Sequence, residues 1–248
     1  MKNNNSKYLF ILFLFLIINP LFGQISHEHN IVLGFLQLKD QFNLGMVFNG
    51  IQIEYRYGLK WNINDHEIMY QPKLGFGLAF KRKMIGGQIH FAPVNVSWTM
   101  PFYEKNGHTI RGGANFITDY NYQYYQLNDG TLFYTAELGF SPIIQYGYQW
   151  DNKRVNLGLQ NSLFGFSSHR QGYDPYKFMF TWRDFVVEPH KNLNFGSYNR
   201  YNHTNFSVGF TPNVDKIHAI VYEFDYLGFF WGNQFHRINH NFLWRMSL

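Results

Sequence analysis

The segment Asn202-His-Thr-Asn-Phe-Ser-Val-Gly209 carries the residue types of a hydrolytic site. Histidine is the usual general base in proteins, and serine becomes a nucleophile when a neighbouring base removes its proton. In an extended chain His203 and Ser207 lie on one face, and Glu223 on the next extended stretch could orient the histidine. The segment is therefore a candidate site for acyl transfer.

The spacing of these residues argues against that chemistry. Residues four apart on a strand are separated by about 13 Å, too far for His203 to deprotonate Ser207. His236 and His240 are also four apart, which is a metal-ligand spacing on a helix but not on a strand. Cysteine is absent, which excludes thiol catalysis and disulfides. We therefore expect no catalytic residues, no metal site and no cofactor.

The composition indicates a chain that alternates polar and apolar residues. Of its 248 residues 21% are aromatic and only 15% are charged, whereas ordinary globular domains have roughly 25% charged residues. The mean hydropathy is −0.30, and after Ile18 no apolar run approaches the ~20 residues of a membrane-spanning helix. A sequence that is aromatic, poor in charge and only mildly hydrophobic is typical of a transmembrane β-barrel.

The basic excess does not indicate a nucleic-acid surface. The formal charge is +5, but a nucleic-acid interface gathers Lys and Arg on one face or helix. The densest clusters are short and lie at expected turns: Lys81-Arg82-Lys83 and Lys153-Arg154. We therefore expect no nucleic-acid partner, and the first cluster could instead meet anionic lipid headgroups or lipopolysaccharide.

The N-terminus has the layout of a cleaved secretory signal. A basic, polar stretch over residues 1–7 precedes the apolar run Tyr8–Ile18, and Asn19-Pro20 ends that run. Small Gly23 then precedes Gln24, although the cleavage box lacks the favoured alanines. We interpret residues 1–23 as a signal peptide and residues 24–248 as the mature domain, with a retained membrane anchor as the alternative.

The mature chain alternates with period two, which predicts β-strands with two unlike faces. In Gly50–Asn62 apolar Ile51, Ile53 and Tyr55 oppose polar Gln52 and Glu54. The same pattern recurs in residues 68–80, 94–102, 110–124, 131–150, 155–166, 203–210, 220–226 and 242–248. We predict an all-β, antiparallel up-and-down barrel of about ten strands, with eight to twelve as the range.

Turn residues set the order of these strands. Asn49-Gly50 predicts a two-residue hairpin. Residues 31–48 are one strand with a bulge near Lys39-Asp40 or two strands, and an even number of strands with both termini on one side favours one. Short polar turns are expected on one rim, at 62–65, 104–107, 151–152 and 212–215, and the other connections on the opposite rim, at 81–87, 126–130, 167–197 and 232–233. Phe178–Trp182 could add a hairpin and bring the number of strands to twelve.

The apolar rows are expected to face lipid. Several strands alternate for more than the nine to eleven residues that a tilted strand needs to cross the hydrocarbon. Aromatic residues gather at strand ends, where they would form girdles at the headgroups: Trp61, Tyr120, Tyr122, Tyr124, Tyr146, Tyr148 and Trp150. The alternative is a soluble sandwich that buries these rows in its core.

The polar rows then face a narrow lumen, which side chains largely fill at about ten strands. We predict a polar network there, made of Glu54, Arg56, Arg111, Asp119, Glu137, His203, Glu223, Asp225 and Arg245. Within it the four carboxylates of Asp119, Glu137, Glu223 and Asp225 are expected to pair with Arg56, Arg111 and Arg245. Such a network would plug the barrel rather than line an open channel.

The C-terminal residues Phe242–Leu248 resemble the assembly signal of bacterial outer-membrane β-barrel proteins, with apolar residues at alternate positions. The chain departs from that pattern by ending on Leu248 rather than an aromatic residue. The resemblance covers architecture only. It implies localisation in the cell outer membrane, with outer-membrane lipid and the barrel-assembly machinery as partners.

Two enzyme classes of such barrels provide alternatives. Outer-membrane phospholipases and lipid A deacylases resemble one another in a His-x-Ser-Asn motif, from which this chain departs because Asn205 stands two residues after His203. The acidic dyads of ten-stranded barrel proteases need carboxylates at the outer rim, where the long loop offers only Asp174 and Asp184. A lipid hydrolase that uses His203 is the alternative function.

We expect a non-enzymatic membrane protein that acts as an anchor, a binding protein or an envelope accessory protein, or as a narrow, porin-like channel. Its extracellular loops would do the binding. The longest loop is rich in aromatic and basic residues that suit glycan, lipopolysaccharide or an envelope protein: His169, Arg170, Tyr173, Tyr176, Trp182 and Arg183.

Overall fold

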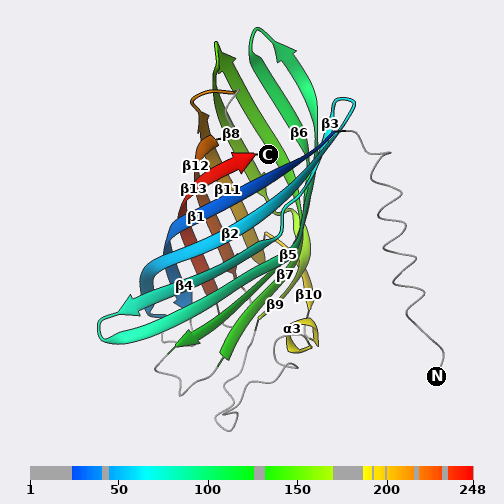
Figure 1. Ribbon diagram of the computed structural model, residues 1–248. Helices are drawn as coiled ribbons and strands as arrows, with labels where there is room; N and C mark the ends of the chain where they lie inside the picture. The colour runs from blue at the N-terminus through cyan, green and yellow to red at the C-terminus, as the bar shows by residue number, and fades with distance from the viewer. Residues whose placement is uncertain are drawn as a thin grey trace, which may run out of the picture.

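The computed structural model describes residues 24–40, 45–125, 132–169, 187–191, 193–198, 200–214, 218–230 and 234–247. The expected signal peptide, residues 1–23, lies outside this part of the chain. One short helix, α3 (Glu188–Lys191), lies near the end of the barrel that carries the longer loops (Figure 1). Among the described residues no helix has the length and apolarity to cross a membrane.

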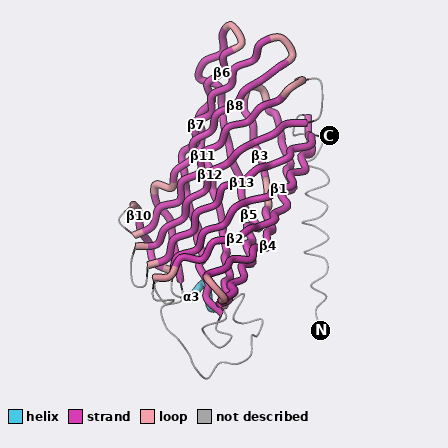
Figure 2. The backbone as a smooth tube through the Cα atoms, turned by 90° about the vertical axis from the view of Figure 1, so that its left-hand side faces the viewer, coloured by secondary structure: helices cyan, strands magenta, loops and turns pink. Residues whose placement is uncertain are grey.

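The described strands form a single antiparallel sheet. It closes on itself because the pairings that run from β7 through β6, β5, β3, β2, β1, β13, β12 and β11 to β8 are completed by the pairing of β8 with β7. Figure 2 shows the strands running obliquely around the barrel. The strands are β1 (Gln24–Asp40), β2 (Val47–Ile63), β3 (His66–Tyr70), β4 (Lys73–Lys81), β5 (Met84–Lys105), β6 (His108–Tyr125), β7 (Leu132–Trp150), β8 (Lys153–Asn161), β9 (Phe164–His169), β10 (Asn194–Ser197), β11 (Tyr201–Thr211), β12 (His218–Phe229) and β13 (Phe235–Ser247).

These strands make a barrel of ten, as the alternation predicted. Three of the ten are interrupted: β3 continues into β4, β8 into β9 and β10 into β11. The first interruption falls at Gln71-Pro72, where proline lacks the N–H that a strand needs to donate. The segment Phe178–Trp182, which could have added a hairpin, lies outside the described residues.

The two rims differ as expected. Short turns join β2 to β3, β5 to β6 and β7 to β8 at one end, which we call the turn rim. Asn64, Asn106, Gly107 and Asp151 take positive φ in these turns. Gln24 pairs with Asn62, and β13 ends beside the start of β1, so both ends of the described chain lie at the turn rim. The opposite end is the loop rim, and in outer-membrane barrels the short turns face the periplasm.

The prediction for the first hairpin is wrong. Asn49 and Gly50 lie inside β2, where Asn49 pairs with Gln37 of β1 and with Phe80 of β4. Residues 31–48 are therefore not one strand, and the chain reverses between Asp40 and Val47. Gly50 does not form a turn. It allows β2 and β4 to pack closely, because a Cβ atom at this position would overlap the carbonyl oxygen of Leu78.

Large apolar side chains project from the outside of the barrel. Leu33, Phe35, Ile51 and Ile220 are each about 60% exposed, although they belong to central strands. In hydrocarbon an unpaired backbone N–H or C=O group costs several kcal/mol, and a closed sheet has no strand edge that would leave such groups unpaired. The closed sheet and its apolar exterior therefore suit a membrane. The single closed sheet also shows that the soluble sandwich is wrong.

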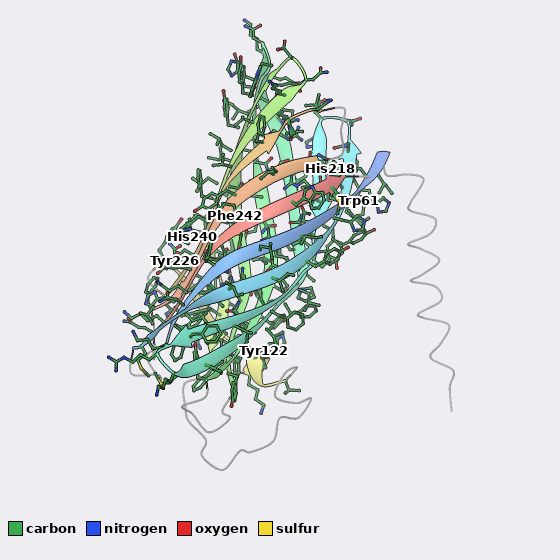
Figure 3. All side chains as sticks on the ribbon, turned by 60° about the vertical axis from the view of Figure 1, so that its left-hand side comes forward. Trp61, Tyr122, His218, Tyr226, His240 and Phe242 are labelled. Carbon is green, nitrogen blue, oxygen red and sulfur yellow. The ribbon has the colours of Figure 1, made fainter. Side chains whose placement is uncertain are left out.

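Aromatic and histidine side chains gather toward both ends of this exterior, as girdles at the headgroups do. Near the turn rim Tyr148 stacks on Trp150, and His218 packs against Trp244. Figure 3 shows Trp61 and His218 toward the turn rim and Tyr122 toward the loop rim.

Candidate functional site

The interior of the barrel is divided into three layers along its axis. Ten buried side chains near the loop rim form the first, which we call the apolar layer: Leu36, Leu38, Phe48, Ala79, Tyr125, Phe133, Tyr201, Leu227, Phe229 and Phe235. Nine buried charged or titratable side chains form the second, the ionic belt: Glu54, Arg56, His90, Asp119, Glu137, His203, Glu223, Asp225 and Arg237. The third is a polar vestibule at the turn rim.

Arg56 on β2 connects two carboxylates of the belt. Its two terminal nitrogens donate to the two oxygens of Glu223 on β12, at 2.8 and 2.7 Å. Its Nε donates to Glu54, two residues earlier on the same face of β2. The bidentate geometry fixes the guanidinium in direction as well as position.

Arg237 on β13 connects two further carboxylates, and its side chain is fully buried. Its Nη2 lies 3.0 Å from Asp225 on β12 and 3.3 Å from Asp119 on β6. Because β12 and β6 are not neighbours in the sheet, this contact crosses the lumen. A side chain that reaches across the lumen closes the interior at this level.

Two histidines bridge carboxylates within the belt. The His203 ring lies 2.8 Å from Glu137 through Nδ1 and 2.8 Å from Asp225 through Nε2. The His90 ring lies 2.6 Å from Glu54 and 3.0 Å from Asp119. A neutral imidazole has one N–H, so each bridge needs one more proton, on the ring or on a carboxyl group. The belt therefore holds protons as part of its structure.

Amide side chains surround the belt on the β13 side. Asn241 donates to Glu223 at 3.2 Å, and Gln52 donates to Asn241 at 2.8 Å. Asn239 donates to Asp225 at 3.4 Å. Buried charges are stable only when hydrogen bonds satisfy them, and these amides supply part of that need.

Three members of the belt could contact one metal ion. One ligand atom from each of Asp119, Glu137 and His203 falls within 4.8 Å of the others. Asp119 already contacts Arg237 and His90, and both ring nitrogens of His203 contact carboxylates. A cation would have to displace these contacts and lie close to a guanidinium, so the donor set fits a proton-sharing network better than a metal.

The vestibule is a cavity of about 440 Å³ that leads from the turn rim toward the ionic belt. A deeper cavity of about 150 Å³ shares Met69, Gln145, Ser207 and Arg245 with it and reaches the belt at Arg56. The charged side chains that line the vestibule are Glu28, Lys60, Glu67, Arg111, Arg154 and Arg245. The polar part of the lumen is thus accessible from the turn rim and ends at the belt.

The structure brings together seven of the nine predicted lumen residues in the belt. The other two, Arg111 and Arg245, line the vestibule instead. Arg111 donates to Thr99 and to the carbonyl oxygen of Asp65, and Arg245 lies 3.6 Å from Glu28. Their expected pairing with the belt carboxylates is therefore wrong.

Arg237 and His90 are the members of the belt that the sequence analysis missed. Arg237 shares its face with Asn239 and Asn241, so the alternation in β13 was a signal for it. His90 was harder to place, because a register shift between Phe91 and Val94 reverses the alternation in the middle of β5. A β-bulge of this kind changes which residues face inward.

The candidate hydrolytic residues do not assemble as the motif suggested. Both ring nitrogens of His203 contact carboxylates, whereas Ser207 lines the vestibule. Glu223, expected to orient the histidine, instead binds Arg56. His236 and His240 project outward, where they contact the hydroxyl groups of Tyr226 and Tyr222.

The predicted loop site lies beyond the described part of the chain. His169 ends β9, and nothing is described of its side chain. Arg170, Tyr173, Tyr176, Trp182 and Arg183 fall in residues 170–186, which are not described. The same holds for the two carboxylates of the long loop, Asp174 and Asp184.

Comparison with known proteins shows the fold. No protein-family model and no curated protein matches the sequence. Among solved structures, the outer membrane protease OmpT from Escherichia coli is similar with a TM-score of 0.51 at 8% sequence identity, over 90% of this chain and 95% of that chain.

Two further structures match at lower scores. Neisserial surface protein A matches with a TM-score of 0.37 at 8% identity, over 89% of this chain and 97% of that chain. The β domain of the Bordetella autotransporter BrkA matches with a TM-score of 0.42 at 8% identity, over 91% of this chain and 100% of that chain.

Proposed function

Since the chain is an integral β-barrel protein of the bacterial outer membrane, we propose that it is a sealed, non-enzymatic anchor whose binding surfaces lie at its two rims. One observation carries this proposal: the ionic belt and the apolar layer lie one after the other across the lumen. An ion or solute that enters from the vestibule would have to pass both.

The two layers oppose passage for different physical reasons. In the belt Arg237 and Glu137 are at most 1% exposed, and their charges contact partners on other strands. Removing one partner of such a buried pair leaves an uncompensated charge, which costs several kcal/mol. In the apolar layer Phe48 packs against Tyr125 with ring centroids 4.9 Å apart, so water would have to cross a mostly hydrocarbon barrier.

Sealing the lumen leaves the rims for binding. The vestibule would face the periplasm, and its arginines give it a polar, partly basic lining. Residues 170–186, which follow β9 in the chain, contain the aromatic and basic residues that suit glycan, lipopolysaccharide or envelope-protein contact. This part of the proposal rests on the composition of the loop.

Planar-bilayer recordings test the seal. We expect the purified wild-type protein to give no conductance steps, because both layers are intact. A variant with only the apolar layer reduced, Phe48→Ala with Phe229→Ala, should also stay silent. Adding Arg237→Ser should produce steps, since that variant opens both layers.

The recordings need a control for folding, which is the shift of gel mobility on heating that a folded barrel shows. Steps from the heat-modifiable wild-type protein would contradict the sealed anchor and support a channel. Silence of the triple variant, while it remains heat-modifiable, would also contradict the assignment of the seal to these two layers.

A further inference from the structure

The outer wall of the barrel is hollowed where β13, β1, β2, β4, β5 and β6 pass side by side. We call this hollow the outer groove, and its volume is about 1040 Å³. Its lining includes Ile51, Ile53, Phe76, Leu78, Tyr122 and Phe242. Figure 3 marks two of these residues, Phe242 and Tyr122, on this side of the barrel.

A row of residues in register across the wall accounts for the hollow. Asn241 pairs with Gly34, Gly34 with Gln52, Gln52 with Gly77, and Gly77 with Gln88. These five positions face the lumen, and two of them have no side chain. Glycines in strands often mark a bend or a close approach.

The neighbours of these glycines show a close approach. A Cβ atom at Gly34 would overlap the side-chain oxygen of Asn241, and one at Gly77 would lie 2.7 Å from Leu36. The amides of Gln52 and Asn241 are bonded at 2.8 Å across the space that a side chain at Gly34 would fill. The wall therefore lies against the contents of the lumen, and the exterior is concave there.

The groove has the size and lining of a site for hydrocarbon chains. Ile51, Ile53, Phe76 and Leu78 are each more than half exposed on its floor and walls. Pockets for small ligands occupy about 300 to 1000 Å³, so the outer groove is at the upper end of that range. The groove lies on the apolar outer wall, which would face the hydrocarbon of the membrane, and the ligand available there is an acyl chain.

A basic cluster lies at the loop-rim end of the groove. Lys81 is the last residue of β4, Arg82 and Lys83 form the tight turn to β5, and Lys39 near the end of β1 is exposed. None of these four forms an ion pair with a described residue. The hairpin residues 73–92 contain no Asp or Glu. Lys81 follows Leu78 of the groove by three residues, which is about 10 Å along a strand.

We propose that the outer groove binds a phosphorylated glycolipid of the outer leaflet, of the lipid A type. The acyl chains would lie in the groove and the phosphates would meet Lys81, Arg82 and Lys83. Because the short turns face the periplasm, the loop rim lies at the outer leaflet. The phosphates of the glycolipid and the basic turn would then lie at the same depth in the membrane. The proposal does not require the lumen to be sealed.

Binding to the full-length protein in detergent tests the proposal. The probes are bisphosphorylated lipid A, the same lipid after removal of both phosphates, and phosphatidylglycerol, with native mass spectrometry as the readout. We expect saturable one-to-one binding of lipid A, with at least tenfold weaker binding of the other two. Equal affinity for lipid A and its dephosphorylated form would overturn the role of the basic turn.

Variants separate the two parts of the site. Lys81→Ala with Arg82→Ala and Lys83→Ala should weaken lipid A binding at least tenfold, and Lys105→Ala with Lys153→Ala at the turn rim is the control. Ile53→Trp should fill the groove and weaken binding similarly, whereas Leu159→Trp, on the outer face of β8, should not.

Every variant side chain in these sets projects outward or lies in a turn or at a strand end next to one, and heat-modifiability confirms folding. Equal binding by the groove variant and its control would overturn the groove as the site. Protein dimers that form without lipid and are lost in Ile53→Trp would assign the groove to a second copy of the chain, and this too would overturn the proposal.

Discussion

Asp119 on β6 and Glu137 on β7 lie directly opposite each other, and both side chains are buried in the lumen. Each has one carboxylate oxygen without a hydrogen-bond partner among the described residues. Like charges at directly opposed positions of an antiparallel pair are destabilising. The pair is tolerated because His90 and His203 contact the remaining oxygens from either side and Arg237 contacts Asp119.

Because Asp119 and Glu137 are like charges in directly opposed positions, we predict that Glu137→Gln is a mild substitution. The amide keeps an oxygen for His203 and removes one of the two opposed negative charges. We expect a loss of no more than about 1 kcal/mol in the free energy of unfolding. Glu223→Gln is the comparison, since it weakens the bidentate contact with Arg56 and should cost about 2 to 3 kcal/mol. Denaturant unfolding followed by tryptophan fluorescence measures both, and equal losses would contradict the prediction.

Arg237 should be among the most sensitive positions of the lumen. Arg237→Ala leaves Asp119 and Asp225 buried without their shared guanidinium, which predicts a loss of about 3 to 5 kcal/mol. Arg245→Ala is the matched control, because Arg245 lies at the vestibule, partly exposed, and should cost about 1 kcal/mol or less. The measurement is the denaturant midpoint, and a loss at Arg237 as small as that at Arg245 would argue against the belt.

Gly50 is predicted to be intolerant of any side chain. A Cβ atom there would overlap the backbone of β4, which cannot move without breaking its pairing with β2. We expect Gly50→Ala to lower the yield of heat-modifiable protein severely. Gly87→Ala is the control, since its Cβ would meet only the Gly77 oxygen at 4.0 Å. Equal yields from the two variants would contradict the close approach.

The proposal that the protein is not an enzyme predicts no turnover of acyl lipids. Both ring nitrogens of His203 contact carboxylates, so this ring is not free to activate a serine. The assay is fatty-acid release from phospholipid and from lipid A by the purified, folded protein. Release that disappears in His203→Ala, while the variant remains folded, would establish the hydrolase instead.

The alternation of residue types, together with the length of the strands and the aromatic residues at their ends, was sufficient to predict the barrel. Side chains in a strand alternate between faces whatever their partners are, so Gly50–Asn62 alone shows which residues of β2 share a face. The turns at Asn106-Gly107 and Asp151-Asn152 were predictable because turn chemistry depends on a few adjacent residues. The hairpin prediction at Asn49-Gly50 was wrong because the sequence does not distinguish a glycine needed for a turn from one needed for close packing against a neighbouring strand.

The contents of the lumen were decided by the closed sheet. Which inward side chains meet depends on the register and tilt of ten strands together, and no single strand contains that information. Arg237 thus reaches Asp119 across 118 residues of sequence. The bulge that turns His90 inward and the glycine row that hollows the outer wall also depend on pairings between strands. The sequence by itself determined that the strands have two unlike faces and number about ten, and only the tertiary structure decided which residues lie at the same depth in the barrel.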